Sequence, residues 1–531
     1  MRDLDGLQPD VIVVGAGSAG CALTRRLVDQ GIEVLLLEAG GPDDNPAIHD
    51  PARFHELWHA AEDWDYYTVA QPHAANRELH WPRGRVLGGS SCLNGLIHVR
   101  GARADYEAWV AAGAEGWGWD DVLPAFRAME DFDGGESELH GVGGPVSILS
   151  RYPLAPVHES IIAAAGEAGI ERNPDYNGGE LDGVSQQQLT IRDGRRDSAA
   201  AAYLRPVLGK PSLRVLTGAH ARRLLLARGR CVGVEWERDG VMESASAGEV
   251  VVCAGAIGSP RLLLLSGIGP ADELRELGIA VAADLPGVGR NLHDHLLSPA
   301  IFSAERPIAP PGAGQSPIQT HLWWRSRPGL PAPDTQPIHF GVPLYEPWMS
   351  GPPNGFTLLG GLVRPASRGA IRLSGPDPED PLLIDPQVLA EPEDLQALAA
   401  SVTQVREIGA ATALREEWGA RELYPGTDVR TSEQLRDYVR RTAITYHHQV
   451  GTCRIGDDAE AVVDPRLRVR GIDGLRVADA SVMPSVTSGN TNAPSLMIGE
   501  RAAWFVAAGG DQSRALTSAA ARSPDRTAPS M

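Results

Sequence analysis

The first forty residues contain two apolar runs separated by a helix-like segment. Residues 11–14 read VIVV, residues 21–31 read CALTRRLVDQG, and residues 32–38 read IEVLLLE. Short apolar runs on either side of a helical segment are typical of parallel strands joined by a crossover helix. The pattern therefore predicts a strand–helix–strand unit near the start of the chain.

Similar pieces recur far along the chain. Residues 213–237, 249–265 and 475 to about 506 again combine strand-like apolar runs with helix-like segments. Interleaved strands and helices of this kind predict an α/β domain that binds a nucleotide. We assign it three discontinuous segments: 1–155, 211–297 and 447–509.

Between these segments the pattern changes. Proline-rich connections such as IAPPGAGQSP (308–317) alternate with apolar stretches such as FTLLGGLV (356–363). We interpret residues 156–210 and 298–446 as a second, sheet-based domain that binds the substrate. Two domains also suit a chain of 531 residues, which exceeds what one hydrophobic core usually organises. Residues 510–531 are small and polar without an apolar period, which predicts a disordered tail.

Charge and composition limit the classes of molecule that this protein is expected to bind. The formal net charge is −20 and the isoelectric point is near 5.2, so there is no general electrostatic attraction to nucleic acid or to an anionic membrane. The first residues, MRDLDGLQPD, are polar and acidic, and no later apolar run reaches membrane-spanning length. We expect a small-molecule partner, no nucleic acid, no membrane span and a cytoplasmic location. The five cysteines form no C-x-x-C pair, which is consistent with reduced thiols.

The first apolar run opens into a glycine motif. Gly15, Gly17 and Gly20 have G-x-G-x-x-G spacing, and Glu38 ends the second run. Such glycines allow a tight turn and close approach to a pyrophosphate at a helix N-terminus, and an acidic residue about 20 positions later meets a ribose diol. The unit predicts a dinucleotide site, for either NAD or FAD. The alternative is a glycine-rich turn that only packs a helix on a sheet.

A second glycine-rich stretch covers residues 82–101, PRGRVLGGSSCLNGLIHVRG. Apolar residues such as Val86, Leu93 and Ile97 are poorly suited to a loop left in water. We therefore favour a buried loop that covers a ligand over a mobile surface loop.

These motifs, together with three others, resemble the glucose-methanol-choline (GMC) family of flavin-dependent oxidoreductases. GRVLGGSSCLN (84–94) and GAIGSPRLLLLSGIG (255–269) match the two family signatures, and GAGSAG, HQVGTCRIG and GNTNAPSLMIGERAA extend the match from residue 11 to about 507. The resemblance implies FAD, a Rossmann-like domain with a second domain, and oxidation of a primary or secondary alcohol. Oxygen or another electron acceptor would reoxidise the flavin. A GMC-type hydroxynitrile lyase, which uses FAD without net redox chemistry, is the alternative.

The resemblance also implies which residues contact the cofactor. Some relatives tether FAD through a histidine where this chain has Leu93, so the implied FAD is bound noncovalently. The implied cofactor-binding residues are Gly15, Gly17, Ser18, Gly20, Glu38, Ala39, Arg85, Val86, Gly88, Ser91, Asn94, Gly95, Ala221, Asp479 and Ala480.

Two adjacent histidines, His447 and His448, are candidates for catalysis. Successive side chains of an extended segment point to opposite faces, so at most one of them faces a shared reaction centre. The family's catalytic histidine stands three residues before a Gly-Thr pair, which selects His448, and alignment through the last motif implies Asn492 as its partner. His447 and His98 are candidates for the substrate pocket wall; a packed histidine is the leading interpretation of His447 and an equal alternative for His98.

One further histidine pair raises the question of a metal. His293 and His295 in GRNLHDHL form an H-x-H pair, which on a strand places two ligands on one face. No third ligand is apparent nearby, and the resemblance implies a structural loop here. We therefore predict no metal site.

Overall fold

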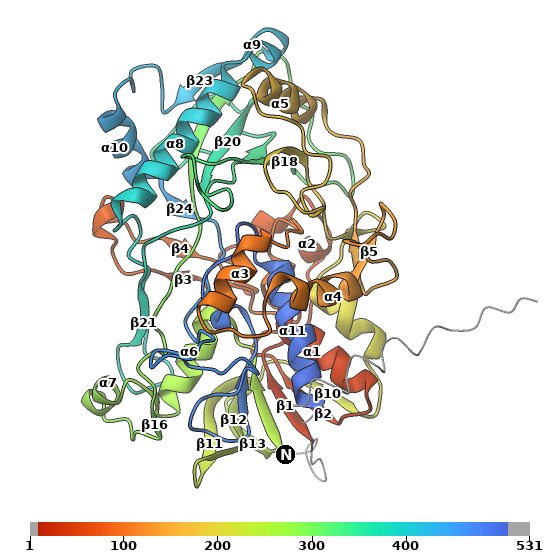
Figure 1. The fold of residues 1–531 in the computed structure, drawn as a ribbon, viewed down its shortest axis with the longest axis vertical. Coiled ribbons are helices and arrows are strands. Elements are labelled where there is room, and N and C mark those ends of the chain that lie inside the picture. Colours follow the sequence, from red (N-terminus) through yellow and green to blue (C-terminus); the bar gives the residue numbers. More distant parts are fainter. Residues whose placement is uncertain (1–8, 508–531) are drawn as a thin grey trace, which may run out of the picture.

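The computed structural model describes residues 9–507, which form two sheet-centred regions (Figure 1). A parallel sheet lies in the lower part of the view, and an antiparallel sheet with helix α8 lies in the upper part. The chain passes between them several times, so residues distant in sequence meet where the two regions adjoin.

The parallel sheet contains five strands in the order β10–β2–β1–β14–β25, which are Leu213–Leu216, Val34–Leu37, Val11–Val14, Glu249–Val252 and Leu475–Val477. Val11 pairs with Val34 on one side and with Glu249 on the other. All residues of β1 and β2 are buried, as expected for strands covered on both faces. The predicted strand–helix–strand unit is confirmed, with α1 (Ser18–Asp29) as its helix.

Helix α11 (Asn492–Ala507) lies directly against α1. A Cβ atom at Gly499 would stand 2.3 Å from the Ala19 carbonyl oxygen, so only glycine allows the two backbones to approach this closely. The carboxy-terminal helix is thereby fixed to the helix that follows the first glycine motif.

The antiparallel sheet has β23 (Arg421–Tyr424), β17 (Leu296–Ser303), β20 (Gly355–Leu362), β19 (Ile338–Phe340), β18 (Ile318–Trp323) and β7 (Gly183–Gln186) in that order, with β24 (Ile444–Thr445) also paired to β17. Alternate side chains of these strands serve opposite faces. Ala300, Phe302 and Leu358 pack with Val405 and Ile408 of α8 (Pro392–Gly409). Leu297 and Leu359 of the same strands belong to a different apolar cluster, together with Ile338 and Tyr446.

Smaller elements complete the fold. The strands β11 (His220–Ala227), β12 (Arg230–Arg238) and β13 (Val241–Ser246) form a three-stranded sheet. Two-stranded pairs are β3 (Tyr66–Tyr67) with β4 (His80–Trp81), β5 (Glu130–Phe132) with β6 (Val146–Ile148), β8 (Ile191–Arg192) with β9 (Arg195–Arg196), β15 (Ile268–Gly269) with β16 (Ala283–Asp284), and β21 (Ala370–Leu373) with β22 (Leu382–Asp385). The other α-helices are α2 (Pro46–His49), α3 (Arg103–Ala111), α4 (Trp119–Met129), α5 (Pro156–Glu167), α6 (Gly255–Leu265), α7 (Ala271–Glu276), α9 (Thr412–Trp418) and α10 (Ser432–Thr442).

The predicted α/β class with a second sheet-based region is confirmed. The domain boundaries stay predictions, and the predicted tail at 510–531 lies outside the described residues. Among residues 9–507, no helix combines the length and the apolar character that crossing a membrane requires.

Candidate active site

A cavity of about 780 Å³ lies between the two sheets. Its walls include Gly15, Gly17 and Glu38 at the carboxyl ends of the parallel strands, and Leu297 and Leu359 from the antiparallel sheet. The carboxyl ends of parallel strands are where α/β sheets bind ligands. One end of the cavity is therefore polar and rich in backbone, and the other is formed by apolar side chains.

The polar end begins at the turn between β1 and α1. Gly15 has φ +103°, and a Cβ there would stand 2.5 Å from the Cys253 carbonyl oxygen. Gly17 is the residue before α1 and has no side chain that could cap the helix. A Cβ at Gly17 would meet no atom within 4 Å. The first N–H groups of α1 consequently face open space beside Gly17 and Ser18, which suits a pyrophosphate.

Glu38 stands at the end of β2 and lines the same part of the cavity. Its carboxylate accepts hydrogen bonds from the N–H groups of Ala16 (2.9 Å) and Gly40 (2.8 Å). Burial raises the pKa of Glu38 to about 7, although these hydrogen bonds oppose the shift. A fixed, buried acceptor beside the glycine turn fits a ribose diol, and Ala39 and Ala221 line the wall next to it.

Asp479 follows β25 and contacts the start of α6. Its Oδ2 accepts hydrogen bonds from the Ser259 hydroxyl (2.5 Å) and the Gly255 N–H (2.8 Å), and its Oδ1 accepts one from the Ser481 N–H (2.8 Å). Burial raises the pKa of this carboxyl, against the effect of its donors. Asp479 thus connects the end of β25 to α6, and it lines the cavity together with Ala480.

The predicted ligand-covering loop lies against the first glycine motif. A Cβ at Gly89 would stand 2.6 Å from the Cα of Gly17, so the loop backbone touches the α1 turn. Leu93, Asn94 and Gly95 line the cavity, and Leu93 has 4% of its surface exposed. A leucine offers no nucleophilic atom for a covalent bond to a ligand.

Five predicted cofactor residues do not line the cavity: Gly20, Arg85, Val86, Gly88 and Ser91. They support the residues that do. A Cβ at Gly20 would stand 1.9 Å from the Gly15 carbonyl oxygen, and the Ser91 hydroxyl donates to the Gly88 carbonyl at 2.6 Å. The Arg85 guanidinium lies 5.0 Å from the centre of the Trp64 ring. Sequence alone could not separate contact from support, because both roles fall within one motif.

His448 lies where the polar and apolar walls meet. Its Nε2 is 3.1 Å from the Asn490 amide nitrogen, and its Nδ1 is 3.0 Å from Nδ1 of His295. The Asn490 side-chain oxygen accepts a hydrogen bond from the Gln336 amide at 3.1 Å, so its NH₂ group points to His448. Nε2 of His448 is then the acceptor, and the ring proton sits on Nδ1 and points at His295.

The surroundings keep His448 neutral. Burial lowers the pKa of His448 well below its usual 6.5, and repulsion from His295, His447 and Arg83 adds to the shift. Nε2 therefore stays unprotonated at neutral pH, with its lone pair directed at the Asn490 amide. A neutral imidazole beside an amide donor is suited to accept a proton from a hydroxyl group.

The predicted partner of His448, Asn492, needs correction. Asn492 begins α11, and its side-chain oxygen accepts a hydrogen bond from the Ser18 hydroxyl at 2.7 Å, which places it at the pyrophosphate end. Asn490, two residues earlier and before the helix, contacts His448 instead. The GNTN segment carries both asparagines, and only the position of the helix start distinguishes them.

The GRNLHDHL segment supports His448 and forms no metal pair. Asp294 accepts hydrogen bonds from the His448 N–H (2.7 Å), the Gln449 amide (3.0 Å) and the Thr445 hydroxyl, and burial raises the pKa of Asp294 to about 6. His293 is engaged elsewhere, because its Nε2 accepts the Val486 N–H at 2.9 Å. No local pattern indicates that Asp294 and His295 contact His448, which is 153 residues or more away.

The two histidines predicted for the wall of the substrate pocket lie in different places. His447 lines the cavity with its ring 5.2 Å from that of Trp58, and its carbonyl accepts a hydrogen bond from Arg83 at 2.7 Å. His98 is fully buried and does not line the cavity; its Nε2 is 3.0 Å from Glu130. The prediction that His98 borders the pocket is therefore wrong, because a buried carboxylate draws its ring the other way.

Comparisons with known proteins point to one family. The GMC oxidoreductase family models match residues 9–297 and 365–499. An oxygen-dependent choline dehydrogenase of Rhizobium etli is 39% identical, and an alcohol dehydrogenase [acceptor] of Pseudomonas putida is 38% identical; each match covers 94% of this chain and 95% of the relative. The crystal structure of pyridoxine 4-oxidase from "Mesorbium loti" superposes with a TM-score of 0.90 at 38% identity, covering 94% of this chain and 99% of that one.

Family and geometry agree on the cofactor. The glycine turn, Glu38 and the loop at 93–95 line one cavity, and their backbone donors, buried acceptor and close cover fit an adenine dinucleotide. The chain therefore belongs to the GMC oxidoreductase family and is an FAD-dependent oxidoreductase.

Proposed function

We propose that the protein oxidises a primary or secondary alcohol to the aldehyde or ketone. The observation that carries this proposal is the unprotonated Nε2 of His448, which faces the cavity beside the Asn490 amide and can exchange that contact for a substrate hydroxyl. His448 removes the hydroxyl proton while a hydride leaves the same carbon, so the C–O single bond becomes a carbonyl and two electrons leave the alcohol. Bound FAD supplies the ring nitrogen that accepts this hydride, and oxygen or another electron acceptor then reoxidises the flavin.

Asn490 stabilises the oxygen of the substrate as its proton departs. Its NH₂ group carries two donors, and the contact with His448 uses only one of them. An amide donor stabilises developing negative charge without taking up the proton, and such a donor is commonly worth about 2.7–4 kcal/mol. In this proposal His448 is therefore the base, and Asn490 is the hydrogen-bond donor that stabilises the substrate oxygen.

The apolar end of the cavity indicates the class of alcohol. Tyr446 stacks on the His448 ring with 4.6 Å between ring centres, and its apolar cluster continues along the wall. The members of this cluster that line the cavity are Phe54, Ile97, Leu297, Ile318, Ile338, Leu359, Tyr446, Trp58, Phe340 and Ile444. Near the base the wall thus offers apolar surface, which favours an uncharged aryl or alkyl alcohol.

This wall of the cavity is less suited to binding a cationic alcohol. Glu346 lines the cavity, but burial raises the pKa of its carboxyl, with Arg77 opposing that shift. A carboxyl with a raised pKa, already facing an arginine, is a poor partner for a quaternary ammonium group. We therefore propose an apolar alcohol rather than choline as the preferred substrate.

A matched pair of substrates tests this proposal. 3,3-Dimethylbutan-1-ol is the uncharged carbon isostere of choline, so the two differ mainly in charge. We expect kcat/KM for the neutral alcohol to exceed that for choline by roughly tenfold or more, because an unpaired cation loses its hydration in an apolar pocket. Preference for choline would contradict the substrate class; failure of every alcohol tried to bleach the flavin anaerobically would contradict alcohol oxidation and favour the lyase alternative.

Denaturation should release the cofactor completely. Leu93 stands where a tether would attach and has no atom that can form one. After acid or heat denaturation and filtration, we expect all flavin absorbance in the filtrate and none with the precipitate. Flavin that remains with the polypeptide would contradict noncovalent binding.

The pH profile should reflect the lowered pKa of His448. The base form persists at every pH above that pKa, which burial holds well below 6.5. We expect the limiting rate constant of flavin reduction to be level above pH 6.5 and to fall only as the pH drops through the lowered pKa. Stopped-flow reduction across pH checks this, and a rate that rises through a pKa of about 7 or higher would contradict it.

A further inference from the structure

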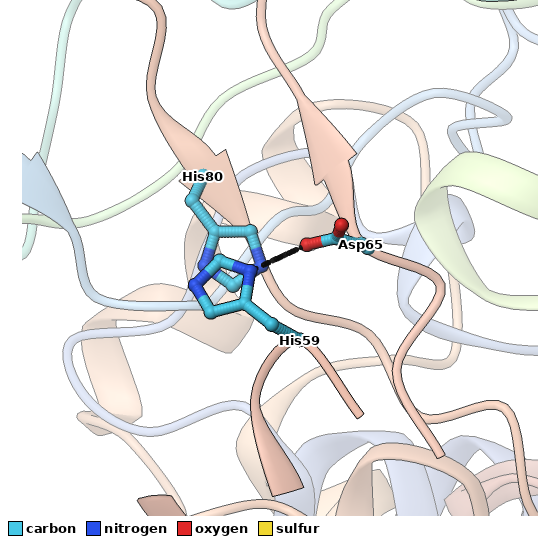
Figure 2. A group of neighbouring side chains, drawn as sticks. All are labelled: His59, Asp65 and His80. Atoms are coloured by element: carbon cyan, nitrogen blue, oxygen red, sulfur yellow. Dashed lines mark hydrogen bonds and ion pairs between the residues drawn. The ribbon is translucent and has the colours of Figure 1, made fainter. Parts of the chain in front are cut away.

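Outside the catalytic cavity, His59, Asp65 and His80 bring three potential ligand atoms together (Figure 2). Nδ1 of His59 is 2.7 Å from Oδ1 of Asp65, and Nε2 of His80 is 3.1 Å from the same oxygen. In Figure 2 the two imidazole rings lie face to face, with both nitrogens directed at the Asp65 carboxylate. We propose that these three side chains form a binding site for a divalent transition-metal ion, with Zn²⁺ as the best match.

The ligand atoms match the needs of such an ion. All three lie within 4.8 Å of one another. A tetrahedral Zn²⁺ holds imidazole nitrogen and carboxylate oxygen at about 2.0–2.2 Å, which places the ligand atoms about 3.3 Å apart. Two imidazoles and one carboxylate form a set that Zn²⁺ commonly takes, with the fourth position left to water. Ordinary side-chain adjustment would thus convert the present contacts into coordination.

The site is open to solvent on one side. The side chains of His59 and Asp65 are 54% and 49% exposed, whereas that of His80 is 18% exposed. An ion can therefore reach the two outer ligands directly and is held against the inner one. The half-buried His80 fixes where the ion would sit.

A buried carboxylate, Asp63, lies behind the cluster. Its Oδ2 is 3.1 Å from Nε2 of His80, the nitrogen that would bind the ion, so the ion would replace this contact. Asp63 accepts hydrogen bonds from the backbone N–H groups of His59 (3.1 Å) and Asp65 (3.0 Å). These two hydrogen bonds hold the backbone of the two outer ligands in place. Asp63 also provides negative charge next to the proposed ion.

The location gives the ion a consequence for the enzyme. His59 follows Trp58, Asp65 lies between Trp64 and Tyr66, and these three aromatic residues all line the active-site cavity. A bound ion would tie the segment after Trp58 to the strand pair β3–β4. It would thereby stiffen the wall that carries Trp58, whose ring lies beside His447.

No metal site is predicted from the sequence, because a pattern such as H-x-H reveals only ligands that stand close together in the chain. His59, Asp65 and His80 come from a loop, the residue before β3 and the start of β4, so no local spacing connects them. Only the fold of this segment brings them together.

Isothermal titration of the chelator-treated holoenzyme with Zn²⁺ tests the proposal. We expect one equivalent to bind, and both His59→Ala and Asp65→Asn to weaken binding by roughly tenfold or more. His73→Ala is the matched control, because His73 is an exposed histidine in the neighbouring 3₁₀ helix η2 (Pro72–Ala74). It should bind Zn²⁺ like the wild type.

Thermal melting gives a second readout that does not depend on activity. Zn²⁺ should raise the Tm of the wild type and of His73→Ala but not that of His59→Ala, while the Tm values without metal agree among all three. Absence of stoichiometric Zn²⁺ binding by the wild type would overturn the proposal. So would wild-type affinity in both His59→Ala and Asp65→Asn.

Discussion

Replacing His448 with alanine should slow reduction of the bound flavin by about 10²- to 10⁴-fold. The variant loses the only acceptor that the described structure places beside the Asn490 amide at this junction of the two walls, so the hydroxyl proton must leave to water. Anaerobic stopped-flow mixing with a good alcohol substrate measures the effect directly, because the flavin loses its absorbance as it is reduced.

Two controls make this result specific to the base. The flavin content of His448→Ala should match that of the wild type, because the cofactor end of the cavity is built by other residues. His447→Ala should cost far less, since its side chain packs near Trp58 and makes no hydrogen bond to His448 or Asn490. An unchanged reduction rate in His448→Ala would remove this residue from the mechanism.

Asn490→Ala should lower the same rate constant by about 10²- to 10³-fold, which corresponds to about 2.7–4 kcal/mol for one lost donor. The effect should appear in the maximal rate of reduction more than in substrate affinity, because the donor acts mainly on the oxygen whose charge develops in the transition state. Flavin reduction at saturating alcohol distinguishes the two.

Asn492→Ala is the matched comparison for this prediction. Both residues are asparagines and they stand two positions apart. Asn492, however, accepts a hydrogen bond from Ser18 at the start of α1. We expect Asn492→Ala to lose flavin on dilution while the flavin that remains bound is reduced at close to the wild-type rate. The reverse pattern, slow reduction in Asn492→Ala and normal reduction in Asn490→Ala, would restore the pairing expected from sequence alignment.

Features encoded over short distances could be predicted from the sequence. The unit at residues 11–38 was recognisable because strand, turn, helix and acidic residue follow one another directly, and each has its own local preference. His448 is singled out over His447 by the family resemblance, because only His448 stands three residues before Gly451 and Thr452. In both cases the geometry follows from neighbouring backbone.

Features that depend on distant partners could not be predicted. His98 turns to Glu130, 32 residues onward, and His448 depends on Asp294 and His295 from another segment. Which asparagine meets His448 depends on where α11 begins, and that start is fixed by packing on α1. Local sequence carries no signal for contacts of this kind.

The contact at Gly499 links the helix after the first glycine motif to the helix that follows Asn490. Asn490 stands two residues ahead of α11, and α11 is pressed against α1, whose first turn lines the cavity. Any shift of α1 upon loss of FAD would be transmitted along α11 to the amide that touches the base. The apoenzyme and holoenzyme should therefore differ in the alignment of the reaction centre as well as in cofactor content.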